Sequence, residues 1–157
     1  MEIIIEDIPE EGLEVSATKS DSWFLGLVKD VLGDSFESSD DASLKLDIRL
    51  IEKNVNVDGE LTFSTHPNCD RCLAHYQGCR SIPVNMVLAP LEGVIEADLV
   101  KEDEDFGYYE GDRFDLAEIV REKMFLSEPM KNLCKDDCKG LCQKCGKDLN
   151  TGPCGCS

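Results

Sequence analysis

The chain has 157 residues, 41% of them hydrophobic, which is enough for one domain with a core and a small appendage. Its 33 acidic residues outnumber its 16 lysines and arginines, and the formal charge of −17 argues against a protein that wraps nucleic acid with a broad basic face. The sequence has no apolar run of about 18 residues or more and no secretory signal pattern, so we expect a cytosolic protein without a membrane span.

The first third of the sequence predicts one strand and one helix. Residues 1–8 (MEIIIEDI) resemble a strand that ends at Pro9. Residues 20–33 begin with a Ser-Asp pair that can cap a helix and end at Gly33, which can stop one. A polar loop, 34–43, follows. The apolar residues at helical spacing are Phe24, Leu27, Val28 and Val31.

Residues 43–89 predict an antiparallel meander of three strands. Apolar and polar residues alternate in the first and third segments, as in strands with one wet face. Asp58-Gly59 is typical of a hairpin turn and is expected to join the first two strands. The alternating apolar residues are Leu44, Leu46, Ile48 and Leu50, then Ile82, Val84, Met86 and Leu88.

An acidic segment, 96–112, is interpreted as a flexible connection. Residues 114–130 predict the second helix, with Asp115 and Glu118 as a capping box and Pro129 at its end. One apolar stripe on this helix should pack on the sheet. Its members are Leu116, Ile119, Val120 and Met124.

Nine residues are cysteines, clustered in two places. Cys69 and Cys72 form a C-x-x-C pair, which lets two thiolates converge on one ion from a tight turn. Six more follow the second helix, and among them Cys142 and Cys145 directly precede Gly146, which permits a left-handed end to the turn. In a reducing cytosol, clustered cysteines are more often metal ligands than disulfides.

Eight cysteines suit two tetrahedral zinc sites of four ligands each. We favour a local pairing, in which the last four fold the tail around one ion and the first pair joins the two cysteines just after the second helix. The alternative crosses the two C-x-x-C pairs, as in a zinc ribbon. In the favoured scheme site 1 is Cys69, Cys72, Cys134 and Cys138, and site 2 is Cys142, Cys145, Cys154 and Cys156.

Other uses of these residues carry less weight. Cys79 is left over and is expected to be a buried or idle thiol on a strand, and His66 and His75 are interpreted as structural. Iron held by four thiolates, as in a rubredoxin-like carrier, has similar geometry. Catalytic zinc keeps an open position, so closed all-cysteine sites indicate no enzyme. A redox C-x-x-C favours a helix N-terminus, whereas Cys69 follows a strand.

The tail LCKDDCKGLCQKCGKDLNTGPCGC, preceded by FDLAEIVREKMFLSEPM, closely resembles the YceD family of bacteria and plastids. The internal CDRCL matches the family's C-x-x-C, and the order of sheet, cysteine pair, acidic loop, helix and tail also agrees. The resemblance implies a role in accumulating large-subunit ribosomal RNA, and so a cytoplasmic ribosome-biogenesis or rRNA-processing factor. It further implies that Cys69 and Cys72 belong to the common core, while site 2 is a variable reinforcement.

An acidic protein that binds rRNA must concentrate its bases. If zinc gathers the tail and the first C-x-x-C, their lysines and arginines form one patch beside an acidic body. The alternative is that these bases are merely solvated or offset the negative charge of the thiolates. The candidate bases are Arg71, Arg80, Lys131, Lys135, Lys139, Lys144 and Lys147.

We therefore expect an α+β fold, with a core domain over 1–130 and a zinc-stabilised tail over 131–157 that packs on it. Two zinc ions and a non-enzymatic role with the large-subunit rRNA or pre-ribosome are expected, without a membrane or a small-molecule substrate. A second function class is an acidic adaptor for a basic ribosomal protein or a processing nuclease. A third is a redox carrier.

Overall fold

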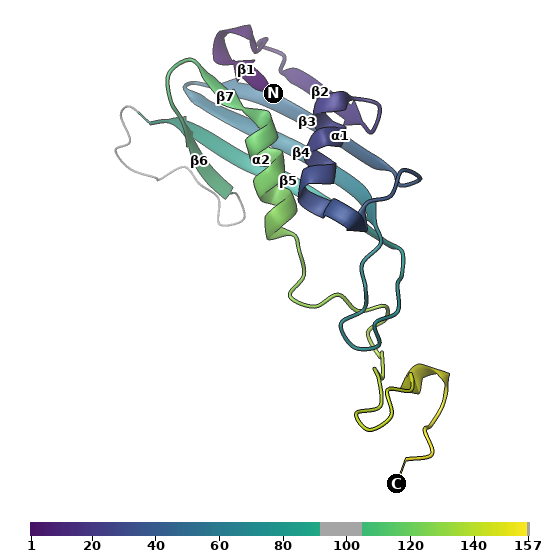
Figure 1. Ribbon diagram of the computed structural model, residues 1–157. Helices are drawn as coiled ribbons and strands as arrows, with labels where there is room; N and C mark the ends of the chain where they lie inside the picture. Colours follow the sequence, from purple (N-terminus) through teal and green to yellow (C-terminus); the bar gives the residue numbers. More distant parts are fainter. Residues whose placement is uncertain (92–104, 157) are drawn as a thin grey trace.

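The computed structural model describes residues 1–91 and 105–156, and its α+β fold agrees with the sequence prediction (Figure 1). The strands of the described residues are β1 (Glu2–Ile4), β2 (Leu13–Thr18), β3 (Ala42–Ile51), β4 (Asn54–Thr65), β5 (Gly78–Pro90), β6 (Asp105–Tyr109) and β7 (Arg113–Asp115). The helices are α1 (Ser22–Leu32) and α2 (Leu116–Leu126), with short 3-10 turns η1 (Ile5–Asp7), η2 (Gly33–Ser35) and η3 (Leu149–Thr151).

Five strands form the main sheet in the order β2-β3-β4-β5-β6. All neighbours are antiparallel except β5 and β6, which run parallel, and β1 pairs with β7 in a separate two-stranded ribbon. Residues 43–89 do form an antiparallel meander of three strands, β3, β4 and β5, but the boundary between the first two differs from the predicted one. Both helices cover one face of this sheet and lie side by side (Figure 1).

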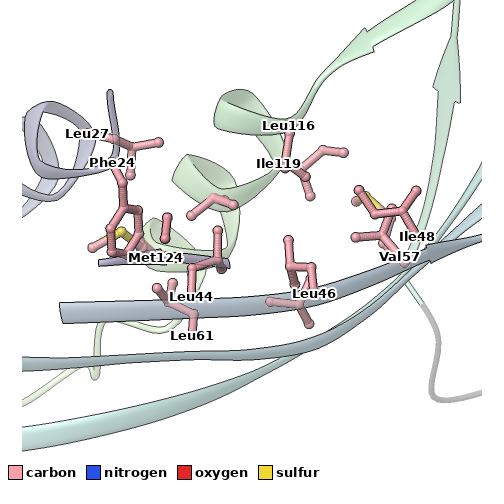
Figure 2. Close-up of a cluster of buried hydrophobic side chains, with 14 of the residues drawn as sticks. Phe24, Leu27, Leu44, Leu46, Ile48, Val57, Leu61, Leu116, Ile119 and Met124 are labelled. Carbon is pink, nitrogen blue, oxygen red and sulfur yellow. The ribbon is translucent and has the colours of Figure 1, made fainter. Parts of the chain in front are cut away.

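The core lies between the helices and that face (Figure 2). Side chains alternate along a strand, so every second residue of β3 to β5 points to the helices and the others lie on the opposite face of the sheet. The predicted stripe of α2 is buried against them, and α1 contributes Phe24 and Val28, both fully buried. The inward strand residues include Leu44, Leu46, Ile48, Val57, Leu61, Phe63 and Val84.

The helix ends follow the predicted signals in part. Asp21 stands at the N-cap position of α1, but its carboxylate makes no capping bond and accepts the N–H of Thr18 instead. Gly33 ends α1 with a positive φ of 53° and an N–H that donates to the carbonyl of Lys29. Asp115 caps α2, because its Oδ1 accepts the N–H of Ala117 at 2.9 Å. The predicted helix over 114–130 is too long, since α2 ends at Leu126, before Pro129.

The hairpin turn predicted at Asp58-Gly59 is wrong. These residues lie inside β4, where Gly59 pairs with Leu46 of β3, and the two-residue turn is Glu52-Lys53. The inward alternation of β4 runs unbroken through Asp58-Gly59, which the local turn signal concealed. Gly59 is needed for close approach instead, because a Cβ there would collide with the carbonyl oxygen of Lys45.

Three further assignments need correction. The predicted strand over 1–8 is only β1, because the chain turns at η1. Strand β2 was not predicted, although it forms an edge of the main sheet. The end of the supposed connection over 96–112 contains β6, which pairs with β5. The rest of that connection, 96–104, lies outside the described residues.

Beyond one end of the sheet, the loop between β4 and β5 and the segment after α2 lie side by side (Figure 1). The end of the tail, coloured yellow, extends beyond them, and Leu141 of the tail donates its N–H to the carbonyl of Arg71 in the loop. The division into a core over 1–130 and a tail over 131–157 stays a prediction.

Candidate metal centres

The first C-x-x-C forms a tight turn between β4 and β5, which we call the first knuckle (69–73). The N–H of Leu73 donates to the carbonyl of Cys69 at 2.8 Å, and the N–H of Cys69 donates to Ala74 at 2.9 Å. Leu73 closes the turn with a positive φ of 58°, a conformation that a leucine adopts at a cost. Cys69 and Cys72 are buried within this turn.

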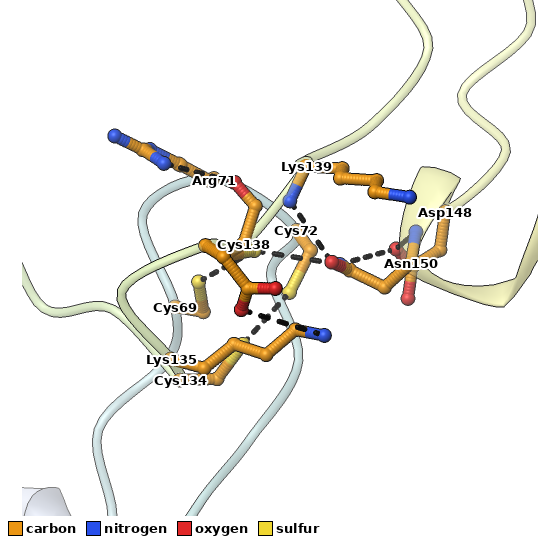
Figure 3. Close-up of polar contacts among 10 residues, drawn as sticks. Cys69, Arg71, Cys72, Cys134, Lys135, Cys138, Lys139, Asp148 and Asn150 are labelled. Carbon is orange, nitrogen blue, oxygen red and sulfur yellow. Dashed lines mark hydrogen bonds and ion pairs between the residues drawn. The ribbon is translucent and has the colours of Figure 1, made fainter.

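The segment after α2 brings two more cysteines to this turn (Figure 3). The sulfurs of Cys69 and Cys138 lie 3.7 Å apart, as do those of Cys72 and Cys134, and all four lie within 4.8 Å of one another. The members of this group are the four residues of the favoured site 1. Three of them are buried and Cys134 is half-buried, and together they form a small cluster separate from the main core.

Hydrogen bonds fasten the two segments together around the sulfurs. The N–H of Asp70 donates to the carbonyl of Asn132, whose own N–H donates to the Asp70 carboxylate at 2.7 Å. The guanidinium of Arg71 donates to the carbonyl of Cys138 at 2.9 Å (Figure 3). These bonds join the loop between β4 and β5 to the segment after α2, so the position of the two segments does not depend on the four thiols alone.

The sulfur positions fit a tetrahedral ion. Zinc–sulfur bonds of about 2.3 Å at tetrahedral angles place neighbouring sulfurs about 3.8 Å apart, close to the observed 3.7 Å. A disulfide requires about 2.05 Å, and every cysteine of the chain is a free thiol. The donor set is therefore suited to a thiolate-binding metal.

Electrostatics in the first group also suit a cation. Burial opposes ionisation of Cys69, but the backbone N–H groups of Cys134, Cys72 and Arg71 outweigh it and lower the pKa of Cys69 to about 6. Burial and the neighbouring sulfurs raise the pKa of Cys134 to about 12. Four sulfurs this close cannot all be thiolates unless positive charge lies among them, and a divalent cation supplies it.

The second group consists of the last four cysteines. Cys142, Cys145, Cys154 and Cys156 also lie within 4.8 Å of one another, and the sulfurs of Cys142 and Cys154 are 3.3 Å apart. This group is less buried than the first, and two of its members are exposed. Because residues 142–156 contribute nothing to either buried cluster, a bound ion would supply most of their order.

The second group uses the same turn as the first knuckle. The N–H of Gly146 donates to the carbonyl of Cys142 at 2.9 Å, and Gly146 has a positive φ of 71°. The backbone N–H groups of Cys145 and Lys144 point at the Cys142 sulfur and lower its pKa to about 6. Gly146 occupies the position that Leu73 has in the first knuckle. Its positive φ agrees with the left-handed end predicted for this turn.

Asn150 connects the two groups and was missed by the sequence analysis. Its side-chain N–H₂ donates to the sulfur of Cys138 at 3.4 Å and to Asp148 at 2.7 Å, while its carbonyl accepts the N–H of Lys139 at 2.9 Å (Figure 3). Hydrogen bonds to ligand sulfurs orient them and stabilise their charge. The sequence carries no signal for this role, because it depends on how the tail folds back.

The two candidate arginines have internal partners. Besides the bond from Arg71 to Cys138, the Arg80 guanidinium donates to the carbonyl of Ser127 at 3.2 Å and to Asn132 at 3.0 Å, and lies 3.4 Å from the carboxylate of Glu128. Arg80 thus ties β5 to the segment after α2.

The five candidate lysines are all exposed. Lys135 lies 3.8 Å from Asp137, and the ammonium of Lys147 donates to the carbonyl of Pro153 at 2.9 Å. Tail residues 131–156 contain these five lysines and three aspartates, so before the thiolates are counted the tail is slightly basic on a chain of net charge −17. Cys79 lies exposed on β5 and belongs to neither group.

Comparison with known proteins places this architecture in a family. A family model described as "Large ribosomal RNA subunit accumulation protein YceD" matches residues 57–157, which include all eight grouped cysteines. No solved structure matches the chain. In the part of the chain that the structure describes, no helix is long and apolar enough to cross a membrane.

Curated relatives come from mycobacteria. An uncharacterised protein of Mycobacterium leprae is 27% identical over 114 residues, and one of Mycobacterium tuberculosis is 28% identical over the same length. Each match covers 71% of this chain, but only 52% and 54% of the two relatives. The chain thus matches about half the length of these curated relatives.

Proposed function

The chain belongs to the YceD family, and from this premise we propose that it is a non-enzymatic, zinc-binding ribosome-biogenesis factor that supports accumulation of large-subunit rRNA in the cytoplasm. The observation that carries the proposal is the extent of the family match. It spans residues 57–157, and so it includes the first knuckle, α2 and both cysteine groups.

Zinc is the proposed metal, with one ion in each cysteine group. The spacing of the sulfurs and the all-thiolate donors support it, since zinc favours four-cysteine structural sites. Four thiolates on one ion leave no position for substrate, so we assign the ions to structure and the protein to no catalysis. Metal analysis should give two zinc ions per chain in a colourless protein. A coloured protein that contains iron would contradict this assignment.

The tail lysines are the proposed contact to RNA or to the pre-ribosome. Lys131, Lys135, Lys139, Lys144 and Lys147 are exposed on a tail that site 1 would hold at one end of the molecule, away from most of the acidic residues. Arg71 belongs to the first knuckle and donates to the carbonyl of Cys138 in the tail, whereas the internal bonds of Arg80 indicate a structural role. Such a patch would bind phosphates locally despite the overall charge.

The test changes Lys139, Lys144 and Lys147 to glutamate and measures co-sedimentation with large-subunit precursors and rRNA binding at several salt concentrations. We expect weaker association. The dependence of the logarithm of the binding constant on the logarithm of the salt concentration should become less steep by about one for each phosphate that the variant no longer neutralises. Zinc content should stay at two ions per chain. Lys29→Glu with Lys53→Glu, at exposed positions of the core, is the control for added negative charge outside the tail. Undiminished co-sedimentation of the tail variant would reject the lysine patch.

An acidic adaptor is the second candidate function. The net charge of −17 favours it, because a strongly acidic surface attracts a basic ribosomal protein or nuclease. Salt-sensitive binding to a basic ribosomal protein, together with no binding to rRNA alone, would favour the adaptor. Binding to rRNA alone that the tail variant abolishes would favour direct contact.

A further inference from the structure

Three segments meet beside the first knuckle and bring together side chains that neither cysteine group uses. They are the turn after η2, which contains Glu37, the end of β4, which leads to His66, and the loop after the knuckle, which contains His75. Nitrogen and oxygen atoms of these three side chains lie within 4.8 Å of one another. The group is the third potential metal-binding cluster in the described residues.

The backbone fixes this arrangement. The N–H of His66 donates to the carbonyl of Ser35 at 2.7 Å, which joins the end of β4 to η2. His75 forms an isolated antiparallel bridge with Asn68, so the knuckle loop returns toward the strand end. As a result the two imidazole rings stack with their centroids 5.8 Å apart and an interplanar angle of 25°.

A buried carboxylate orients the central histidine. Asp40 is only 2% exposed, and its Oδ1 lies 2.8 Å from Nε2 of His66. Its Oδ2 accepts the N–H of Glu37 at 2.7 Å. Asp40 therefore favours the tautomer with the proton on Nε2, which leaves the lone pair on Nδ1. That nitrogen lies 4.0 Å from the Glu37 carboxylate.

This arrangement is the one that proteins use to present histidine to a metal. A ligating histidine almost always donates its second ring N–H to a carboxylate or carbonyl, which orients the ring and raises its basicity. Two imidazoles and one carboxylate suit a divalent transition ion, whereas magnesium and calcium prefer oxygen donors alone. Zinc ligands of this kind lie about 3.3 Å apart, and the exposed side chains of Glu37 and His75 have room to close the remaining gap.

We propose that Glu37, His66 and His75 form a third metal site, which binds a divalent transition ion of the zinc class and has Asp40 as its outer partner. Three protein ligands leave the fourth position open to water or to an oxygen of another molecule. The site differs from the cysteine groups in donors and exposure, so its ion should exchange more readily. The proposal does not depend on the role in rRNA accumulation.

The test uses the full chain with both cysteine groups loaded with zinc, and titrates it with Zn²⁺ and, separately, with Co²⁺. We expect one further equivalent of either ion, and the added Co²⁺ should give the weak visible bands of nitrogen and oxygen ligands rather than strong thiolate absorption. His75→Ala and Glu37→Gln, both at exposed positions, should abolish or strongly weaken this equivalent without loss of the cysteine-bound zinc.

Asp40→Asn should weaken the further equivalent about 10-fold to 100-fold, because it perturbs the outer partner and leaves all three ligands in place. Gln77→Ala and Ser38→Ala, exposed neighbours of His75 and Glu37, are the matched controls and should bind as the unchanged protein does. The proposal fails if no further equivalent binds, or if His75→Ala retains it at full affinity.

Discussion

At the scale of single residues, the first knuckle (69–73) and the corresponding turn of the second cysteine group (142–146) have the same backbone geometry but different closing residues. Both have the N–H of the residue after the second cysteine bonded to the carbonyl of the first, and both close with a positive φ. Gly146 adopts this conformation without steric cost, whereas Leu73 does so at a cost of about 1–2 kcal/mol. Leu73 is 67% exposed, so little packing offsets that cost.

Substitutions at these two positions should affect metal retention by the two cysteine groups in different ways. Gly146→Ala introduces only backbone strain, because no atom lies within 4 Å of the new Cβ. Zinc transfer from the second group to a coloured chelator should therefore become about 5-fold to 30-fold more favourable. Leu73→Gly should leave zinc retention by the first group unchanged or improved, by at most about 1 kcal/mol. Faster release from Leu73→Gly would show that Leu73 contributes packing.

Lys123 is a buried base whose protonation should affect stability. It is 7% exposed in α2, where it forms an ion pair with Asp105, and burial lowers its pKa. The folded state therefore holds this proton less tightly than the unfolded state, in which the pKa is about 10.4. Stability contributed by Lys123 rises with pH toward that value, because the unfolded state binds more protons there.

Replacing this lysine should remove that pH dependence. Lys123→Met keeps an apolar stem of similar length and leaves the exposed carboxylate of Asp105 to solvent. In urea unfolding, the unchanged protein should gain stability relative to Lys123→Met as pH rises from 8 to about 10.4. A difference between the two proteins that stays constant over this range would contradict the assigned pKa direction.

At the scale of elements, the pairing of β3 and β4 depends on two backbone positions. Gly59 allows close contact with β3, since an added Cβ would collide with the Lys45 carbonyl and lie 2.9 Å from the Cα of Leu46. Glu52 forms the actual turn with a positive φ of 58°. Glycine therefore occupies the crowded position inside the strand, and a glutamate occupies the turn where glycine fits well.

Opposite substitutions at these positions should have opposite effects. Gly59→Ala should lower the free energy of unfolding by about 3 kcal/mol or more, because backbone must move to admit the methyl group. Glu52→Gly should leave stability unchanged or raise it by up to about 1 kcal/mol, through relief of the strained turn. Chemical denaturation measures both. A Gly59→Ala protein as stable as the unchanged chain would show that β4 does not pair with β3 in this register.

At the scale of the whole molecule, the sheet with its helices and the cysteine-rich end are stabilised by two separate sets of contacts. The main core involves the sheet and both helices, whereas the buried thiols form their own small cluster with Leu133, Tyr76 and Leu141 at its edge. Metal should therefore stabilise the knuckle and the tail, while apolar burial stabilises the sheet. Asn150, in the segment of the second cysteine group, adds a link to the first group through Cys138.

Removing metal in two steps should reveal this division. Cys154→Ser with Cys156→Ser should lower zinc content from two ions to one and raise hydrogen exchange in residues 142–156, while the first knuckle stays protected. Chelation of both ions should also expose residues 69–76 and 131–141, with the far-UV circular dichroism of the core largely retained. Global unfolding on chelation would show that the core depends on the metal.

The sequence by itself determined much of the architecture and favoured one of two groupings of the cysteines. Periodicity located α1, α2, β3 and β5, because half-buried elements require a repeating apolar face, whereas the predicted turn at Asp58-Gly59 divided β4. Spacing alone favoured the local grouping of cysteines, and the tertiary structure brings those same residues together. The resemblance of the tail also pointed to the family that the comparison identifies.

Only the tertiary structure decided the features that depend on long-range contact. The Asp58-Gly59 signal was local, but the register of β3 and β4 is set by burial along the whole pair, so the turn moved to Glu52. Short strands such as β2 and β6 carry weak patterns and exist through their neighbours. The roles of Asn150 and Asp40, and the meeting of His66 with His75, arise from segments that fold back on one another, and no spacing in the sequence records them.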